Sequence, residues 1–168
     1  MSEAGGVRIR DVEPADVPAV RRLVEDVLGE FGFTAHVGGV ERDLADVAGR
    51  YGGGRAGFWV ADAGGAVVGT VAIRPKDGAR CELKRLYLHP SRRGTGLGQR
   101  LYAHAEAFAR AAGYERIWLD SSRRFGRAHA LYARNGFVLL AHLDNDWEDD
   151  VYEKVLTVTP GGRSSGSG

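Results

Sequence analysis

The fold of this chain is decided by one stretch of sequence, residues 81–99, which reads CELKRLYLHPSRRGTGLGQ. Apolar and polar residues alternate in part over residues 81–89, as they do in a β-strand. Pro90 ends that strand, because proline has no N–H group to donate to a sheet ladder. A glycine-spaced turn follows at once and leads into an amphipathic segment. The stretch therefore predicts a strand, a glycine turn and a helix in direct succession.

The turn at residues 92–98, RRGTGLG, has the composition of a phosphate-binding turn. Glycines let the chain turn tightly and approach a ligand closely, while the N–H groups at a helix start present partial positive charge to an anion. Arg92 and Arg93 would add full charges beside it. On spacing alone, a flexible arginine-rich loop explains the segment equally well.

Two familiar phosphate-binding turns do not fit these residues. A dinucleotide-binding turn follows the first strand of a parallel unit, whereas this turn follows about the fourth strand. A phosphate loop of the NTPase kind carries Lys and then Ser or Thr after its last glycine, and here Gln99 and Arg100 stand instead. The segment therefore matches neither a dinucleotide-binding turn nor the phosphate loop of an NTPase.

Downstream of the turn, apolar residues recur at spacings of four and three up to the stop at Gly113, which predicts a helix over residues 97–112. We then expect a short strand at 117–119, a short helix at 127–134 ended by Asn135 and Gly136, and strands at 137–140 and 151–158. Strands and helices alternate in this half of the chain.

Upstream of residue 81 the pattern changes from alternating elements to consecutive strands. Residues 7–10 predict a strand, and Asp16 offers an N-cap to a helix whose apolar face carries valines 17, 20, 24 and 27. A weaker helical pattern follows Gly38 and Gly39, runs through Leu44 and Val47, and is broken at residues 51–54. Strands are expected at 58–62 and 67–73 around an Ala-Gly-Gly-Ala turn. The whole order predicts a mixed α/β sheet with helices on both faces.

Length and composition indicate the number of domains and the kinds of partner to expect. The 168 residues, 43% hydrophobic and 27% charged, suit one domain over residues 1–159, with a Gly/Ser-rich tail at 160–168 outside it. With 23 basic and 22 acidic side chains the net charge is +1, which favours neither nucleic acid nor a membrane surface as a partner. Cys81 is the single cysteine, and no signal peptide or apolar span is apparent, so we expect a cytoplasmic protein.

The same residues resemble the GNAT superfamily of N-acetyltransferases. The resemblance begins with the strand at residues 81–90 and continues through the Arg-x-x-Gly-x-Gly signature at Arg93, Gly96 and Gly98. It ends with the elements Ala128, Leu131, Tyr132, Gly136 and Phe137. These motifs occur in the order and spacing of the family and cover about the middle third of the chain.

The resemblance implies a mostly antiparallel sheet of about six to seven strands, splayed between strands 4 and 5 and flanked by about four helices. It also implies acetyl-coenzyme A as the acetyl donor. Strand backbone would hold its pantetheine arm and turn amides its pyrophosphate, so that the coenzyme-binding residues are Leu86, Tyr87, Leu88, Arg92, Arg93, Gly94, Thr95, Gly96, Leu97, Gly98 and Gln99. One position departs from the family: Phe125 stands where many members carry an asparagine that touches the coenzyme.

Acetyl transfer to an amine requires a base, because an alkylamine with a pKa of about 10.4 is protonated at neutral pH. Glu82 stands where many family members place that base and is the first candidate. A strand glutamate paired with Lys84 or Arg85 would look the same in sequence. Asp120 is the second candidate, with a helix cap as its alternative role.

Tyr132 stands where the family often places the proton donor for the leaving thiolate. A tyrosine that only packs its ring is the alternative. An N–H group near Tyr87 or Leu88 would polarise the carbonyl oxygen. No metal is expected, since the five histidines show no ligand spacing, and Cys81 lacks the sequence signature of a nucleophile.

Residues 144–150, DNDWEDD, place five acids around Trp147. They would attract a cationic acceptor, or they form a solvated hairpin loop whose tryptophan covers the core.

We expect an enzyme that acetylates a primary amine of a small molecule by direct attack in a ternary complex. The alternatives are a protein or peptide acetyltransferase and an idle module that senses acyl-coenzyme A. Exposed strand edges are compatible with a homodimer.

Overall fold

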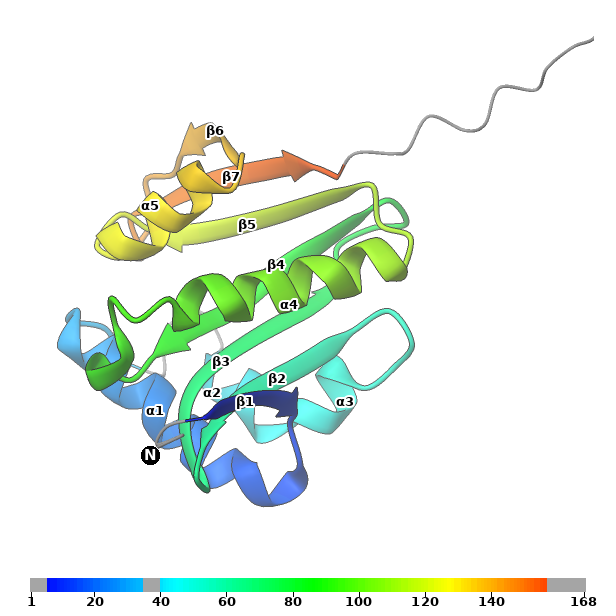
Figure 1. Ribbon diagram of the computed structural model, residues 1–168. Helices are drawn as coiled ribbons and strands as arrows, with labels where there is room; N and C mark the ends of the chain where they lie inside the picture. Colours follow the sequence, from blue (N-terminus) through cyan, green and yellow to red (C-terminus); the bar gives the residue numbers. More distant parts are fainter. Residues whose placement is uncertain (1–5, 35–39, 157–168) are drawn as a thin grey trace, which may run out of the picture.

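The computed structural model describes residues 6–34 and 40–156. In this part of the chain seven strands form one sheet and five α-helices pack against it (Figure 1). The strands are β1 (Val7–Asp11), β2 (Gly57–Ala63), β3 (Ala66–Pro75), β4 (Arg80–Leu88), β5 (Arg116–Ser122), β6 (Val138–His142) and β7 (Asp149–Val155). The helices are α1 (Val17–Glu30), α2 (Val40–Ala45), α3 (Val47–Tyr51), α4 (Leu97–Ala111) and α5 (Gly126–Arg134).

The sheet opens in its middle. Its strand order is β1-β2-β3-β4-β5-β7-β6, and within the described residues β4 and β5 are the parallel pair. These two strands pair only through residues 80–82 of β4, opposite residues 116–118 of β5. Beyond residue 82 they diverge, as Figure 1 shows. The fold class predicted from the sequence is confirmed: a mixed, mostly antiparallel sheet, splayed between the fourth and fifth strands.

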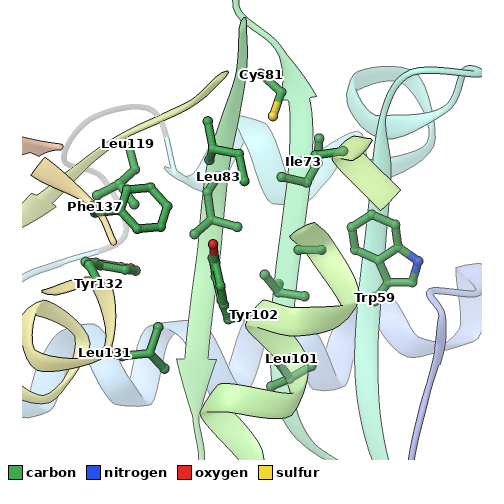
Figure 2. Packing of buried hydrophobic residues seen from close by; sticks show 14 of the residues in the cluster. Trp59, Ile73, Cys81, Leu83, Leu101, Tyr102, Leu119, Leu131, Tyr132 and Phe137 are labelled. Atoms are coloured by element: carbon green, nitrogen blue, oxygen red, sulfur yellow. The ribbon is translucent and has the colours of Figure 1, made fainter. Parts of the chain in front are cut away.

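Two apolar layers hold the sheet between its helices. Helices α4 and α5 cover one face, and α1, α2 and α3 cover the other (Figure 1). On the α4 face, Leu101 and Tyr102 pack over Ile73 and Leu83 (Figure 2). Burying one such aliphatic side chain contributes roughly 1.5–3 kcal/mol. The opposite layer joins α1 to the sheet through Val20, Val24, Leu28, Val60 and Ala72.

The first helix forms as predicted and Asp16 occupies its N-cap position, but the Asp16 side chain makes no capping hydrogen bond to α1. Residues Pro14–Asp16 form a 3₁₀ turn ahead of α1, and the Asp16 carboxylate accepts from the Glu13 amide at 2.8 Å. The same carboxylate pairs with Arg10 at 2.7 Å. The predicted N-cap position is therefore correct, but its carboxylate serves the turn before α1 instead of the helix.

The weak helical pattern over residues 40–51 forms two short helices instead of one. Asp46 separates them, and its side chain accepts from the Gly49 amide at 3.0 Å, which caps α3. The described helices therefore number five, against about four expected from the sequence. The predicted last strand ends at Val155, and residues 157–158 together with the tail at 160–168 lie outside the described residues.

None of the helices in the described ranges has the length and apolarity needed to cross a membrane.

Candidate active site

A cavity of about 860 Å³ lies where β4 and β5 part. Its volume falls within the range of small-molecule sites, roughly 300–1,000 Å³. Two regions of its wall differ in chemistry. The first, here called the glycine end, includes Leu86, Leu88, Arg93, Gly94, Gly96, Gly98, Gln99, Arg127, Leu131 and Arg134. The second, here called the carboxylate end, includes Val27, Phe31, Asp120, Phe125, Asn145, Trp147 and Asp149.

The glycine end presents main-chain N–H groups. Gly94 and Gly96 adopt left-handed φ angles of +75° and +86°, which bend the chain into the start of α4. Among the described residues, the amides of Gly94, Thr95 and Gly96 donate no hydrogen bond, and the first turn of α4 adds further N–H groups without helical partners. This is the geometry of an anion site at a helix N-terminus.

Arginines surround these amides. Arg93 forms an ion pair with Glu30 at the end of α1 and donates to the Leu88 carbonyl at 3.4 Å. A Cβ placed on Gly94 would lie 3.8 Å from the Arg127 guanidinium. Within residues 6–34 and 40–156, Arg127 has no carboxylate partner. The glycine end is therefore basic as well as rich in N–H groups.

An amide pair fixes the two helices that flank this end. Gln99 donates to Asn135 at 2.9 Å, and Asn135 donates back to Gln99 at 2.8 Å. Asn135 also donates to the Leu131 carbonyl at 2.8 Å. The start of α4 and the end of α5 are thereby held together. No motif in the sequence marks this pair, although both residues lie inside the segment that resembles the family.

Tyr132 lies where the two ends meet. Its ring packs against Phe137 and Tyr152 at 5.5 and 5.9 Å, and 5% of the residue is exposed (Figure 2). Burial raises the pKa of Tyr132, the neighbouring Tyr87 adds to the rise, and Ser121 opposes it. The phenol therefore keeps its proton at neutral pH and is available as a hydrogen-bond donor.

Aromatic rings line the carboxylate end. Phe125 packs edge-on against Phe31 at 4.9 Å and lies 6.2 Å from Tyr87. Phe33 lies 4.5 Å from Trp147, so one continuous group of rings joins α1 to the loop before β7. Such rings exclude water and offer their faces to a cation. Phe125 thus contributes an aromatic ring to the cavity wall.

Two carboxyl groups, those of Asp120 and Asp149, also line the cavity. Asp120 lies on β5 and is accessible from the cavity, yet the surrounding protein raises its pKa; Lys84 opposes that rise and Glu82 adds to it. Asp149 is 8% exposed and accepts from Asn145 at 3.1 Å. Burial raises the pKa of Asp149, Asn145 opposes the rise, and Asp120 adds to it.

The structure separates the two candidate bases. Glu82 is not part of the cavity wall in the described residues: its carboxylate pairs with Arg74 and with Lys84, each at 3.3 Å. Asp120 does line the cavity and has no ion-pair partner among the described residues. Nor does Asp120 cap α5, whose N-cap position is Phe125. Tyr132 and Asp120 are therefore brought to one cavity, and Glu82 is not.

The acidic side chains of residues 144–150 do not gather in one cluster. Asp150 pairs with Arg123 at 2.9 Å and Glu148 with Arg124 at 3.3 Å. Of the five acids, only Asp149 lines the cavity. Trp147 forms part of the cavity wall and also packs on the core, so the two roles considered for it coexist.

Most of the coenzyme-binding residues predicted from the sequence line the cavity, namely Leu86, Tyr87, Leu88, Arg93, Gly94, Gly96, Gly98 and Gln99. Three do not. Leu97 is buried in the core, Thr95 closes the turn by donating to the Arg92 carbonyl at 2.5 Å, and Arg92 lies in the 3₁₀ turn Pro90–Arg92. The residues that sequence reasoning missed are Arg127 and Asn135, for which we find no signal in the sequence.

Metal and thiol chemistry receive no support from these residues. In the described part of the chain, no three His, Cys, Asp or Glu side chains gather as metal ligands. Cys81 is buried and does not line the cavity, and burial raises the pKa of its thiol to about 12. A thiol in this state is a poor nucleophile.

Comparisons with known proteins agree with this geometry. Residues 21–137 match the acetyltransferase (GNAT) family. The uncharacterised N-acetyltransferase YjgM of Escherichia coli K12 is 34% identical over 134 residues, which cover 77% of this chain and 78% of YjgM. A GNAT acetyltransferase of Staphylococcus aureus Mu50 superposes with a TM-score of 0.83 at 18% identity, over 90% of this chain and all of its own. The PaiA N-acetyltransferase of Thermoplasma acidophilum, solved in complex with coenzyme A, superposes with a TM-score of 0.71 at 20% identity, over 93% of this chain and all of its own.

Proposed function

Because the chain belongs to the GNAT family of acetyltransferases, we propose that it transfers an acetyl group from acetyl-coenzyme A to a primary amine of a small cationic molecule. One observation carries this proposal: a single cavity joins a basic cup of main-chain amides to two carboxyl groups, with the Tyr132 phenol where they meet. A donor with phosphates suits the first end, and an amine suits the second.

The glycine end fits the coenzyme. Its unpartnered amides and arginines match a diphosphate in charge and in hydrogen-bond donors, and PaiA, a protein of the same fold, binds coenzyme A. The amides of residues 94–99 would hold the diphosphate together with Arg93 and Arg127. The main chain of residues 86–88, which has no β5 partner, would hold the pantetheine arm. The coenzyme supplies an acetyl group activated as a thioester.

The carboxylate end prepares the amine. An alkylammonium ion must lose its proton before its nitrogen can attack. Asp120 is the group of the cavity wall suited to accept that proton, directly or through water, and its raised pKa makes it a better base than an ordinary aspartate. We therefore place Asp120 ahead of Glu82, which would act only through Lys84 or through water.

The reaction balances with these groups alone. The amine nitrogen forms a bond to the carbonyl carbon as the carbon–sulfur bond breaks. Before the attack, the alkylammonium ion gives one proton to Asp120, which releases it to water. As the carbon–sulfur bond breaks, the attacking nitrogen gives its second proton to the freed Asp120 carboxylate, and Tyr132 gives its phenolic proton to the departing sulfur. The two residues return to their starting states by exchanging protons with water. No covalent bond to the protein is formed, which agrees with the burial of Cys81.

The acceptor is expected to be cationic and to lack a carboxylate next to the amine. Lys84, Arg85 and Arg123 are each paired with an acid, whereas Asp120 has no ion-pair partner among the described residues and Asp149 bonds to the neutral Asn145. The carboxylate end thus has an excess of negative charge. Trp147 adds a ring face that attracts an ammonium group.

Release of the coenzyme A thiol tests this proposal when acetyl-coenzyme A is incubated with matched amines. We expect diamines and aliphatic monoamines to turn over, and α-amino acids and lysine peptides to turn over much more slowly. Fastest turnover with peptides would instead identify a protein acetyltransferase. Binding of acetyl-coenzyme A without turnover of any amine would identify an acyl-coenzyme A sensor.

Initial rates test the direct attack. With both substrates varied, a ternary complex gives intersecting double-reciprocal lines. Parallel lines would require an acetylated enzyme and would contradict the proposed chemistry.

A further inference from the structure

Arg85 holds an unusual backbone conformation in the middle of strand β4. Its φ angle is +56°, in the left-handed region that side chains other than glycine rarely adopt. The pairing of β4 with β3 shifts at this point, so that Thr70 and Ala72 of β3 face Tyr87 and Lys84. One extra residue is thus inserted into β4, which is a β-bulge.

The bulge determines which way the next three residues point. Before it, Cys81 and Leu83 pack into the core layer under α4. Regular alternation would continue with residues 85 and 87 on that side. Instead, Leu86 and Leu88 pack under α4, and Tyr87 packs on the opposite layer. These three residues line the cavity, so the wall of the glycine end depends on the bulge.

A buried ion pair lies on this bulge. The Arg85 Nε donates to the Asp43 carboxylate of α2 at 2.8 Å, with side chains that are 9% and 4% exposed. Asp43 also accepts from the Tyr51 hydroxyl at 2.7 Å. The Arg85 carbonyl in turn accepts from the Thr70 hydroxyl at 2.7 Å. Both the side chain and the main chain of Arg85 are therefore held by hydrogen bonds.

We propose that Asp43 is a positioning residue, whose ion pair with Arg85 fixes the bulge and thereby orients residues 86–88 toward the coenzyme arm. This inference rests on the proposed function, since it requires that the cavity binds coenzyme A. Asp43 itself does not line the cavity, and it acts only through Arg85. Helix α2 thus contributes to coenzyme binding without contacting the coenzyme.

Two double variants separate this role from a purely structural one. Asp43→Asn combined with Arg85→Gly, and Asp43→Asn combined with Arg85→Ala, both remove the ion pair without leaving an unpaired buried charge. They differ in one respect: glycine adopts the left-handed conformation without strain, and alanine does not. If the pair serves to hold the bulge, the glycine variant keeps it and the alanine variant loses it.

Calorimetric titration with coenzyme A, below the melting temperatures of both variants, gives the readout. We expect the glycine variant to bind within about threefold of the wild type and the alanine variant about tenfold more weakly. KM for the amine should change less than KM for acetyl-coenzyme A in the alanine variant. Equal affinities in the two variants would overturn the inference. A wild type that binds no coenzyme A would overturn the proposed function and this inference with it.

Discussion

The glycine end of the cavity presents main-chain N–H groups from one short stretch, residues 86–99, with side chains of α5 beside them, whereas the carboxylate end is made of side chains from the end of α1, β5, the turn before α5 and the segment up to the start of β7. The first end tolerates changes of side chain but not of backbone conformation. The second depends on the identity of a few side chains that distant elements bring together. Substitutions at the two ends should therefore impair different steps.

Gly96→Val is expected to have the largest effect. Valine at a φ of +86° is strained, and relief of that strain would move the amides of the turn. Affinity for coenzyme A should fall by about 100-fold or more in calorimetric titration. Gly113→Val is the matched control, because Gly113 has a φ of +83° at the far end of α4. It should lower the melting temperature and leave coenzyme affinity unchanged. Equal loss of affinity in both variants would contradict the role of the turn.

Tyr132→Phe should separate chemistry from binding. Loss of the phenolic proton is expected to lower kcat by about 10²–10³-fold while the Kd for coenzyme A stays within about twofold, because the ring and its packing remain. Stopped assays of thiol release and titration with coenzyme A measure the two quantities. A parallel fall in kcat and coenzyme affinity would assign Tyr132 to packing instead.

Asp120→Asn and Glu82→Gln compare the two candidate bases. We expect the first to lower kcat/KM for the amine by about 10²-fold and the second by less than about threefold. In the wild type, kcat/KM plotted against pH should fall on the acidic side at a pH above the ordinary pKa of aspartate, since burial raises the pKa of Asp120. This acidic fall should disappear in the Asp120→Asn variant. The reverse ranking would return the role of base to Glu82.

The smallest effect concerns stability. A carboxyl group whose pKa is raised by folding binds more protons in the folded state, so its contribution to stability falls as pH rises from about 4 through the folded pKa. The Asp120→Asn variant lacks this loss of stability, so its melting temperature at pH 7 should be slightly higher than that of the wild type. The difference in melting temperature should shrink as the pH falls toward 4. Thermal melts across this range provide the measurement. A variant that melts below the wild type at pH 7 would show that Asp120 is stabilising there.

Sequence reasoning predicted the mixed α/β sheet and the glycine turn from local patterns, whereas the splay of the sheet and the coenzyme-binding residues were implied by the resemblance to the GNAT family. Alternation, glycine spacing and helical period are properties of contiguous residues, and each determines local backbone geometry. Asp16 is at the predicted N-cap position, but its side chain bonds to the 3₁₀ turn that precedes the helix, which no local pattern indicated.

The carboxylate end could not be predicted in the same way. Asp149 resembles its acidic neighbours in sequence, and only the pairing of β5 with β7 brings it beside Asp120. The bulge at Arg85 is equally hidden, because the residue that fixes it, Asp43, lies in another helix. Long-range contacts of this kind carry no spacing that a single sequence reveals.

Hydrogen–deuterium exchange of main-chain amides, with and without coenzyme A, tests most directly whether the turn binds the coenzyme through its backbone. Saturating coenzyme A is expected to slow exchange at residues 94–99 and 86–88, because its phosphates and pantetheine arm would accept hydrogen bonds from these N–H groups. Unchanged exchange at residues 94–99, with protection appearing elsewhere in the chain, would contradict the assignment.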